Sequence, residues 1–276
     1  MRDELLAREF RRVELWPPAV DSDLFHPARK CNSMRARLSN GRPARPLLLT
    51  VSRLAPEKNV GFLADVLREL PQASLAIVGD GPDRPALERR FHGSDARFIG
   101  YLKGKELAEA YASADAFLYA SETETMGNVV LEAMASGCPV VVPKAGGIPS
   151  LVSHQNTGFL YRPRDLQEAT HLTRTVLAND GLRSQVGQAA RQAIEERNWE
   201  HSIDRVHEVY ELAIKQGRSP AAAWTWKQRL AQLTLSGLLA VFQSMAGREK
   251  RVQPEPTLLD LPPAFLDAAN LTKSVA

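Results

Sequence analysis

SETETMGNVVLEAMASGCP, residues 121–139, is the stretch that decides the fold. It follows directly on a β-branched and aromatic run, DAFLYAS, that ends at Ser121. An acidic loop comes next, and from about Gly127 the pattern becomes helical, with Val130, Ala133 and Met134 on one face. The stretch therefore predicts a strand, a loop and the N-terminus of a helix, in that order.

This predicted geometry offers two kinds of polar group to one ligand. The N–H groups of Met126, Gly127 and Asn128 lie at the positive end of a helix dipole, where a diphosphate is stabilised, and Gly127 lets a ligand approach the backbone. Seven residues separate Glu124 in the loop from Glu132 in the helix, and the helical part between them rises only about 7.5 Å. Since carboxylates accept hydrogen bonds from paired hydroxyls, the two can bracket a sugar nucleotide. Taken alone, they also fit solvated charges on a loop and a helix.

Strand and helix patterns alternate on both sides of this stretch. The predicted strands are residues 46–52, 73–81, 96–102, 115–121, 139–145 and 158–163, and the predicted helices between the first four are residues 58–70, 83–91 and 105–114. A basic linker is expected before the first strand, at residues 29–46. After the last strand, further helices are expected to about residue 216. The alternation predicts an α/β fold, a doubly wound parallel sheet with its ligand sites at the carboxyl ends of the strands.

Polar residues follow the first predicted strand. Arg53 and Lys58, in SRLAPEKN, place a fork-shaped guanidinium and a mobile ammonium at one strand end, where they can neutralise a diphosphate. The alternative is a solvated loop with charges at a helix start.

Two glycine pairs also follow predicted strands. Gly79 and Gly81 come after ASLAIV in a pattern that is not G-x-G-x-x-G, so a nicotinamide site is not supported. Gly146 and Gly147 come after PVVV and open another helix. Both pairs fit close approach of a ligand to the backbone, and both equally fit structural turns.

Composition bounds the class of protein. The 276 residues are 44% hydrophobic and 24% charged, as in a soluble globular protein, and the net charge of +3 is too small and dispersed to favour nucleic acid. Cys31 and Cys138 have no metal-ligand spacing, so we expect reduced thiols in an intracellular or organellar compartment. The first residues lack the apolar core of a signal peptide and are too acidic for a transit peptide.

The N-terminal region predicts a connector. Residues 1–11 are expected to form a short helix and residues 13–16 a short strand before the proline-rich segment. Asp21 and Asp23 form a D-x-D pair of the kind that can hold a metal ion against a diphosphate, but turn and capping roles fit them better. His26 likewise fits a packed or capping side chain better than a ligand.

The C-terminal region carries packing patterns and no motif. Trp199 and Tyr210 are interpreted as packing residues of helices that end near residue 216. Residues 217–247 are expected to form an amphipathic helix, either at a membrane interface or packed on another domain, and residues 248–276 a disordered tail.

The motifs together resemble one family. The E-x7-E segment continuing as EAMA-x-G-x-PVV is similar to that of GT4-type retaining glycosyltransferases, which have the GT-B fold. The variant E-T-E-T-x-G, with SRLAPEKN, IVGDGP, AGGIP and AAAWTWK, resembles more closely the C-terminal half of the plant and algal sulfoquinovosyltransferase family, from about residue 3 to 230. Departures are Met126, where many relatives have Phe or Leu, and Pro18-Ala19, where the hinge usually contains glycine.

The resemblance implies roles for the residues that match its motifs. Arg53 and Lys58 would contact the donor phosphates, Glu132 the ribose and Glu124 the hydroxyls of the transferred sugar. The other implied donor-binding residues are Gly79 and Gly81 beside the nucleotide, Tyr101 and Leu102 near the base, Met126, Gly127 and Asn128 at the helix N-terminus, and Gly146 and Gly147 facing the sugar.

The resemblance also implies an organisation and a reaction. Residues 1–28 would be the hinge and a remnant of an N-terminal domain, and residues 29–216 the C-terminal nucleotide-sugar-binding domain of a GT-B enzyme whose N-terminal acceptor domain is missing. Its family transfers sulfoquinovose from UDP-sulfoquinovose to the lipid acceptor diacylglycerol at a plastid (chloroplast) membrane surface, with no cofactor and no obligatory metal.

Three alternatives stay open at this point. The first is a GT4 enzyme with another donor or acceptor. The second is a nucleotide-sugar-binding module without catalysis, and the third is a structural remnant that binds nothing.

Overall fold

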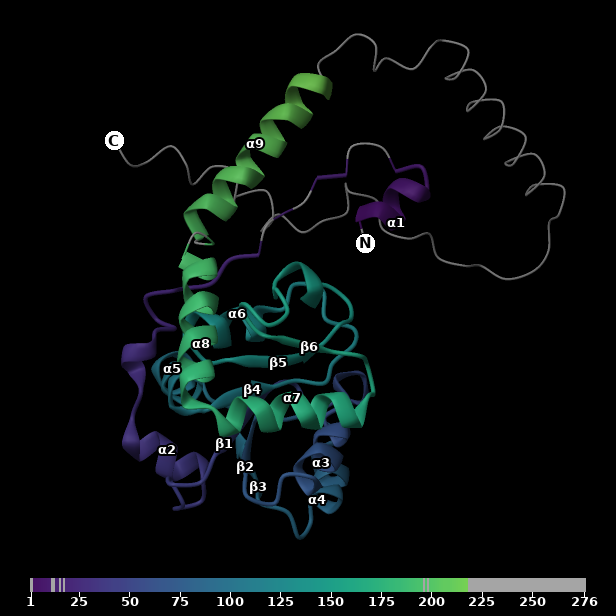
Figure 1. The fold of residues 1–276 in the computed structure, drawn as a ribbon. Coiled ribbons are helices and arrows are strands. Elements are labelled where there is room, and N and C mark those ends of the chain that lie inside the picture. The colour runs from purple at the N-terminus through teal and green to yellow at the C-terminus, as the bar shows by residue number, and fades with distance from the viewer. Residues whose placement is uncertain are drawn as a thin grey trace, which may run out of the picture. The chain divides into compact units, whose positions relative to one another are not determined.

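The computed structural model describes residues 2–10, 13–14, 16, 18–195, 197 and 199–217 (Figure 1). Contacts divide the chain into two units, Met1–Ile214 and Lys215–Ala276, and the sheet with the helices that cover it belongs to the first. The tail predicted at residues 248–276, and the helix predicted at 217–247 beyond its first residue, lie outside the described residues.

Six parallel strands form one sheet in the order β3-β2-β1-β4-β5-β6. Their bounds are β1 Leu47–Val51, β2 Ser74–Val78, β3 Ala96–Gly100, β4 Ala116–Leu118, β5 Val140–Pro143 and β6 Phe159–Tyr161. All six fall inside the predicted strand ranges. The strand order reverses between β1 and β4, and in open doubly wound sheets ligands bind in the crevice at that point, beyond the carboxyl ends of the strands.

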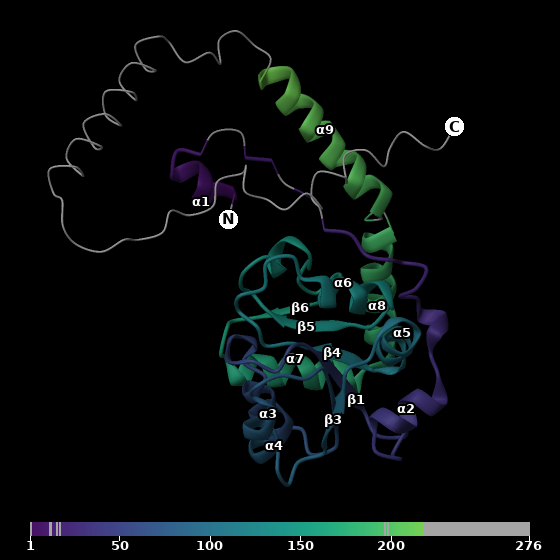
Figure 2. The same ribbon diagram turned by 180° about the vertical axis from the view of Figure 1, so that it is seen from behind.

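Helices cover both faces of the sheet (Figures 1 and 2). One face packs against α2 (Asn32–Leu38), α5 (Gly104–Ser113), α6 (Asn128–Ala135) and α8 (Asp180–Glu195), and the other against α3 (Gly61–Arg68), α4 (Arg84–Arg90) and α7 (Leu166–Ala178). The remaining elements are the helices α1 (Arg2–Ala7) and α9 (Trp199–Gly217) and the 3-10 turns η1 (Pro27–Arg29), η2 (Pro56–Lys58) and η3 (Ile148–Ser150).

The central strands are almost entirely apolar because helices cover both faces of the sheet. Leu47 and Leu49 join the core on the α5 and α6 face, whereas Leu48 joins the core on the α3 face, and all three are fully buried. Because successive strand residues point to opposite faces, both faces of β1 are buried, and its hydroxyl side chain, Thr50, is also only 1% exposed.

Two expectations for the N-terminal region were wrong. The segment 29–46, expected to be a linker, contains α2, which buries Met34 and Leu38 against the sheet. Its Arg-rich composition hides two apolar residues at helical spacing. Of residues 13–16, expected to form a strand, the three that the structure describes lie outside any helix or strand.

The interpretation of Trp199 and Tyr210 as packing residues was also wrong. On α9 they are 47% and 65% exposed, and Ile203 and Ile214 on the same helix are exposed as well. Within the described residues, no helix is long and apolar enough to cross a membrane.

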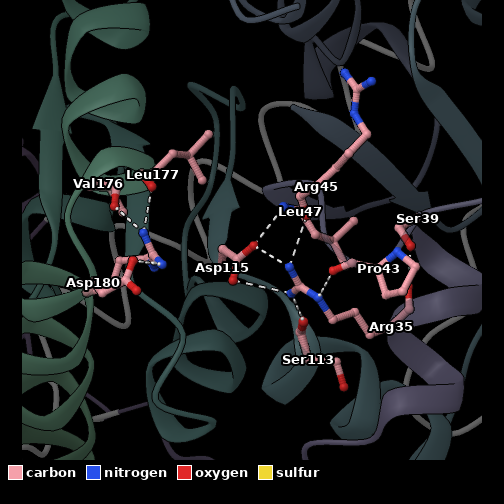
Figure 3. Close-up of polar contacts among 11 residues, drawn as sticks. Arg35, Ser39, Pro43, Arg45, Leu47, Ser113, Asp115, Val176, Leu177 and Asp180 are labelled. Carbon is pink, nitrogen blue, oxygen red and sulfur yellow. Dashed lines mark hydrogen bonds and ion pairs between the residues drawn. The ribbon is translucent and has the colours of Figure 1, made fainter. Parts of the chain in front are cut away.

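A buried ion pair joins the N-terminal segment to the sheet (Figure 3). The Arg35 guanidinium of α2 donates to both carboxylate oxygens of Asp115, at 2.8 and 3.2 Å, and Asp115 also accepts the N–H of Leu47 at 2.8 Å. Arg35 further donates to the carbonyls of Pro43, Arg45 and Ser113. One guanidinium thus fixes the starts of β1 and β4 and the end of α5.

Replacing Asp115 with Ala should lower the free energy of unfolding by about 3 kcal/mol, because it leaves a mostly buried guanidinium and the Leu47 N–H without their partner. The matched control is Arg37→Met, which removes an exposed ion pair with Glu106 and should cost less than about 1 kcal/mol. Urea unfolding at pH 7 measures both, and equal losses in the two variants would show that the Arg35 network has no special role.

Candidate functional site

The acidic loop, residues 121–127, connects β4 to α6 at the carboxyl edge of the sheet, next to the point where the strand order reverses. Gly127 ends the loop as the N-cap of α6 with φ of +70°, a left-handed conformation that favours glycine. A Cβ at this position would lie 2.5 Å from Cδ1 of Leu151, so a side chain here would also require Leu151 to shift.

Three groups from separate elements converge on Glu124. The Lys58 ammonium, in the loop after β1, lies 2.8 Å from Oε2, and the Tyr119 hydroxyl, just beyond β4, donates to the same oxygen at 2.8 Å. The Gly127 N–H lies 3.4 Å from Oε1. An ion pair between the loops after β1 and β4 is consistent with the prediction that Lys58 and Glu124 lie at one edge of the sheet.

Burial and pairing act oppositely on Glu124. Partial burial raises the pKa of its carboxyl, but the hydrogen bonds from Lys58 and Tyr119 outweigh burial, so the pKa lies below its ordinary value. Only 16% of the Glu124 side chain and 20% of the Lys58 side chain are exposed. Glu124 is thus an ionised, oriented carboxylate and not the solvated loop charge of the alternative interpretation.

Glu132 has a different environment. Its Oε2 accepts the hydroxyl of Tyr111, a fully buried residue of α5, at 2.9 Å. Burial raises the pKa of Glu132 to about 7, and the hydrogen bond from Tyr111 offsets part of that rise. A half-buried carboxyl in the second turn of α6 is not a surface charge, and it can accept hydrogen bonds from a ligand that covers it.

A row of aromatic rings supports both carboxylates. The rings of Tyr111 and Phe117 lie 5.7 Å apart, and those of Phe117 and Tyr119 are stacked at 5.6 Å. Tyr111 holds Glu132 and Tyr119 holds Glu124, so one packed layer fixes the positions of both. We did not predict either tyrosine, because both belong to apolar runs that signal only core packing.

Gly146 and Gly147 follow β5 and pack directly against the acidic loop. The N–H of Gly147 donates to the Glu124 carbonyl at 2.7 Å. A Cβ on Gly146 would lie 2.3 Å from the Glu124 carbonyl oxygen, and one on Gly147 would lie 2.2 Å from that of Thr125. The pair therefore has a structural role in holding the loop, whether or not it also faces a ligand.

Gly79 and Gly81 have a comparable role after β2. A Cβ on Gly79 would lie 2.0 Å from the Ser52 carbonyl oxygen, and one on Gly81 would lie 2.3 Å from that of Leu54. Gly79 has φ of +121°. These glycines bring the loops after β1 and β2 together, which supports their interpretation as structural turns.

The other predicted donor-binding residues differ in exposure. Tyr101 is 67% exposed and Met126 39%, and Asn128 at the start of α6 is also exposed. Leu102 is 6% exposed, so its side chain belongs to the core and only its backbone remains for a ligand. The Arg53 side chain is 64% exposed and pairs with Glu57, so the structure does not join it to Lys58.

The alternative roles of Asp21 and His26 are confirmed. Asp21 accepts the N–H groups of Asp23 and Leu24, and His26 Nδ1 accepts that of Ala28 as the cap of η1. In the part of the chain that the structure describes, no group of three or more His, Cys, Asp or Glu side chains is placed to hold a metal ion.

Neither of two cavities in the domain is lined by a predicted site residue. A cavity of about 560 Å³ lies beside the acidic loop, but Glu122, Thr123 and Arg164 line it with residues of α3, and no predicted site residue does. A second cavity, of about 520 Å³, is lined by Arg42, His92 and Asp95, among others, away from the site.

Residues 45–179 match the family described as Glycosyl transferases group 1. Among curated proteins, the sulfoquinovosyl transferase SQD2 of Arabidopsis thaliana is 41% identical over 221 residues, which cover 79% of this chain and 42% of the relative. The GDP-mannose-dependent alpha-mannosyltransferase of Mycobacterium tuberculosis is 37% identical over 221 residues, covering 80% of this chain and 56% of the relative. The chain thus spans about half the length of the curated relatives it matches.

Solved structures support the same fold. Sucrose-phosphate synthase from Thermosynechococcus elongatus superposes with a TM-score of 0.69 at 25% identity, covering 78% of this chain and 56% of the other. Anabaena HepE, in complex with UDP and glucose, superposes with a TM-score of 0.60 at 25% identity, covering 73% and 55%. The predicted Rossmann-like domain of GT-B type is confirmed.

Glu132 should make stability fall as the pH rises. The folded carboxyl keeps its proton up to about pH 7, whereas in the unfolded chain the proton leaves near the ordinary value of 4.5, so between these values the folded state binds more protons. The free energy of unfolding should therefore decrease across this window, by up to about 3 kcal/mol.

Urea unfolding from pH 5 to 8 measures this effect as the difference between the native chain and Glu132→Gln. The variant keeps a partner for Tyr111 but cannot ionise, so it should be the more stable protein at pH 8. The control Glu106→Gln changes an exposed carboxylate and should parallel the native chain. A Glu132→Gln curve that also runs parallel to the native one would disprove the raised pKa.

Proposed function

Because this chain belongs to the glycosyl transferase group 1 family and contains a Rossmann-like domain of GT-B type, we propose that it holds the nucleotide-sugar donor of a retaining glycosyltransferase. The observation that carries the proposal is the ion pair of Lys58 with Glu124, which lies where the strand order reverses and is held by Tyr119. A carboxylate that two side chains hold in a fixed orientation at this edge of the sheet is suited to accept hydrogen bonds from a polar ligand.

The diphosphate would lie at the N-terminus of α6. Gly127 places the first N–H groups of that helix at the carboxyl edge, where the helix dipole favours an anion. The Lys58 ammonium has three N–H donors, so it can hold Glu124 and a phosphate oxygen together. The guanidinium of Arg53 can turn toward the same group, because its ion pair with Glu57 is exposed and weak.

These groups would also catalyse departure of the nucleotide. When UDP leaves, negative charge grows on its β-phosphate, and Arg53, Lys58 and the α6 N-terminus would stabilise that charge more in the transition state than in the ground state. Glu132 would accept the ribose hydroxyls and Glu124 those of the sugar, so that the anomeric carbon is oriented for transfer. This scheme requires no cofactor and no obligatory metal.

The proposed reaction is transfer of sulfoquinovose from UDP-sulfoquinovose to diacylglycerol. Its support is the 41% identity to a sulfoquinovosyl transferase, together with UDP and glucose in the HepE complex. The resemblance implies that an N-terminal GT-B domain would bind the lipid acceptor. A plastid membrane surface is the corresponding location and rests on the resemblance alone.

A second candidate is mannosyl transfer from GDP-mannose. The observation in its favour is the 37% identity to a GDP-mannose-dependent alpha-mannosyltransferase, over the same length of chain. Binding separates the two proposals, because a UDP-sugar domain should prefer UDP to GDP.

Calorimetric titration of the purified chain with UDP should show saturable binding, and Glu132→Ala should weaken it by at least about tenfold, because the ribose loses a carboxylate partner. Glu124→Ala should leave UDP affinity within about threefold, since Lys58 becomes free for the diphosphate. If the sugar makes the native chain bind a UDP-sugar more tightly than UDP, Glu124→Ala should bind the two with equal affinity.

Unfolding curves of both variants serve as controls for folding. If both variants lost affinity for UDP and for the UDP-sugar equally, the division of roles between the two carboxylates would be refuted. Tighter binding of GDP than of UDP by the native chain would favour the mannosyl donor.

A further inference from the structure

The basic side chains at the carboxyl edge are almost all neutralised. The loops after the six strands, including the first residue of α4, carry Arg53, Lys58, Arg84, Lys103, Lys144, Arg162 and Arg164. Five of them pair with carboxylates: Arg53 with Glu57, Lys58 with Glu124, Arg84 with Asp80 and Glu88, Arg162 with Asp165 and Glu168, and Arg164 with Glu122. Lys103 and Lys144 are exposed and have no ion pair among the described residues.

Lys144 lies close to the acidic loop. Its N–H donates to the Tyr161 carbonyl at 2.7 Å, which continues the pairing of β5 with β6 by one residue. Val140 and Val142 of β5 belong to the core on the α6 face, as does Tyr119, and Lys144 is the first residue beyond this strand. Gly146 follows two residues later, at most about 7 Å along the chain, and packs on the Glu124 carbonyl.

Lys103 has the same charge and exposure but a different place. It follows β3, the outermost strand, which β2 and β1 separate from β4. Lys144 follows β5, the direct neighbour of β4. The two lysines therefore form a matched pair, one beside the acidic loop and one remote from it.

The carboxylates of the acidic loop already have basic partners, so an additional cation beside the loop is free to bind an anionic group. Glu122 and Glu124 bring two negative charges, and Arg164 and Lys58 already neutralise them. A neutral hexose needs no further cation there, whereas a sugar with an anionic substituent adds a charge that the carboxylates would repel. A compact ammonium on a flexible stem is suited to such a group.

On the basis of the proposed function, we infer that Lys144 is a specificity-determining residue that binds an anionic substituent, such as a sulfonate, on the transferred sugar. The exposed position of the lysine suits a contact formed only when the donor is bound. The inference concerns the sugar alone, so affinity for UDP itself should not depend on Lys144.

The test is calorimetric titration of the full chain with UDP, UDP-glucose, UDP-glucuronate and UDP-sulfoquinovose. The native chain should bind the sulfonated donor more tightly than UDP-glucose. Lys144→Met should weaken the affinity for UDP-sulfoquinovose by about tenfold, as expected for loss of one charge-assisted contact. The same variant should change the affinities for UDP and UDP-glucose by less than about twofold. Lys144→Arg should retain most of the preference, and Lys103→Met should behave as the native chain.

The outcomes separate the inference from the proposal beneath it. Absence of UDP binding by the folded native chain would overturn the proposed donor site itself. UDP binding with no effect of Lys144→Met on UDP-sulfoquinovose, or an equal effect of Lys103→Met, would overturn the role of Lys144 and leave the donor site standing. Tighter binding of UDP-glucuronate than of UDP-sulfoquinovose would assign the same lysine to a carboxylated sugar and overturn the sulfonate assignment.

Discussion

The ion pair between Lys58 and Glu124 is the interaction on which the site depends. It joins the loops that follow β1 and β4, the two strands between which the sheet reverses its order. Both side chains are mostly buried, and a buried charge without its partner costs several kcal/mol. The Tyr119 hydroxyl and the Gly127 N–H reduce that cost by sharing the same carboxylate. The pair therefore connects the acidic loop to the loop after β1.

Backbone contacts set the second constraint on the site. Gly147 donates to the Glu124 carbonyl, and a side chain on either Gly146 or Gly147 would collide with the loop. The loop is thus held by β1 through a charge and by β5 through a close backbone contact. These contacts hold Glu124 and the α6 N-terminus in place, and such preorganisation is what stabilisation of a developing phosphate charge requires.

The sequence predicts the sheet well because its signal is local. Apolar runs broken by turn residues place all six strands, whereas α2 was missed since only Met34 and Leu38 mark its buried face. Spacing and resemblance identify Lys58, Glu124 and Glu132, but not whether the carboxylates are buried. Their environments come from Tyr111 and Tyr119, which tertiary packing brings to them. The glycine pairs were ambiguous in sequence, and close contacts with carbonyl oxygens now give each a structural reason.

A crystal structure of the chain with UDP would test the account most directly. The account predicts the diphosphate against the N–H groups of Met126, Gly127 and Asn128 and the Lys58 ammonium, with the ribose hydroxyls on Glu132. UDP bound elsewhere on the domain, out of contact with Lys58 and Glu132, would contradict the claim that the ion pair of Lys58 with Glu124 marks a donor site.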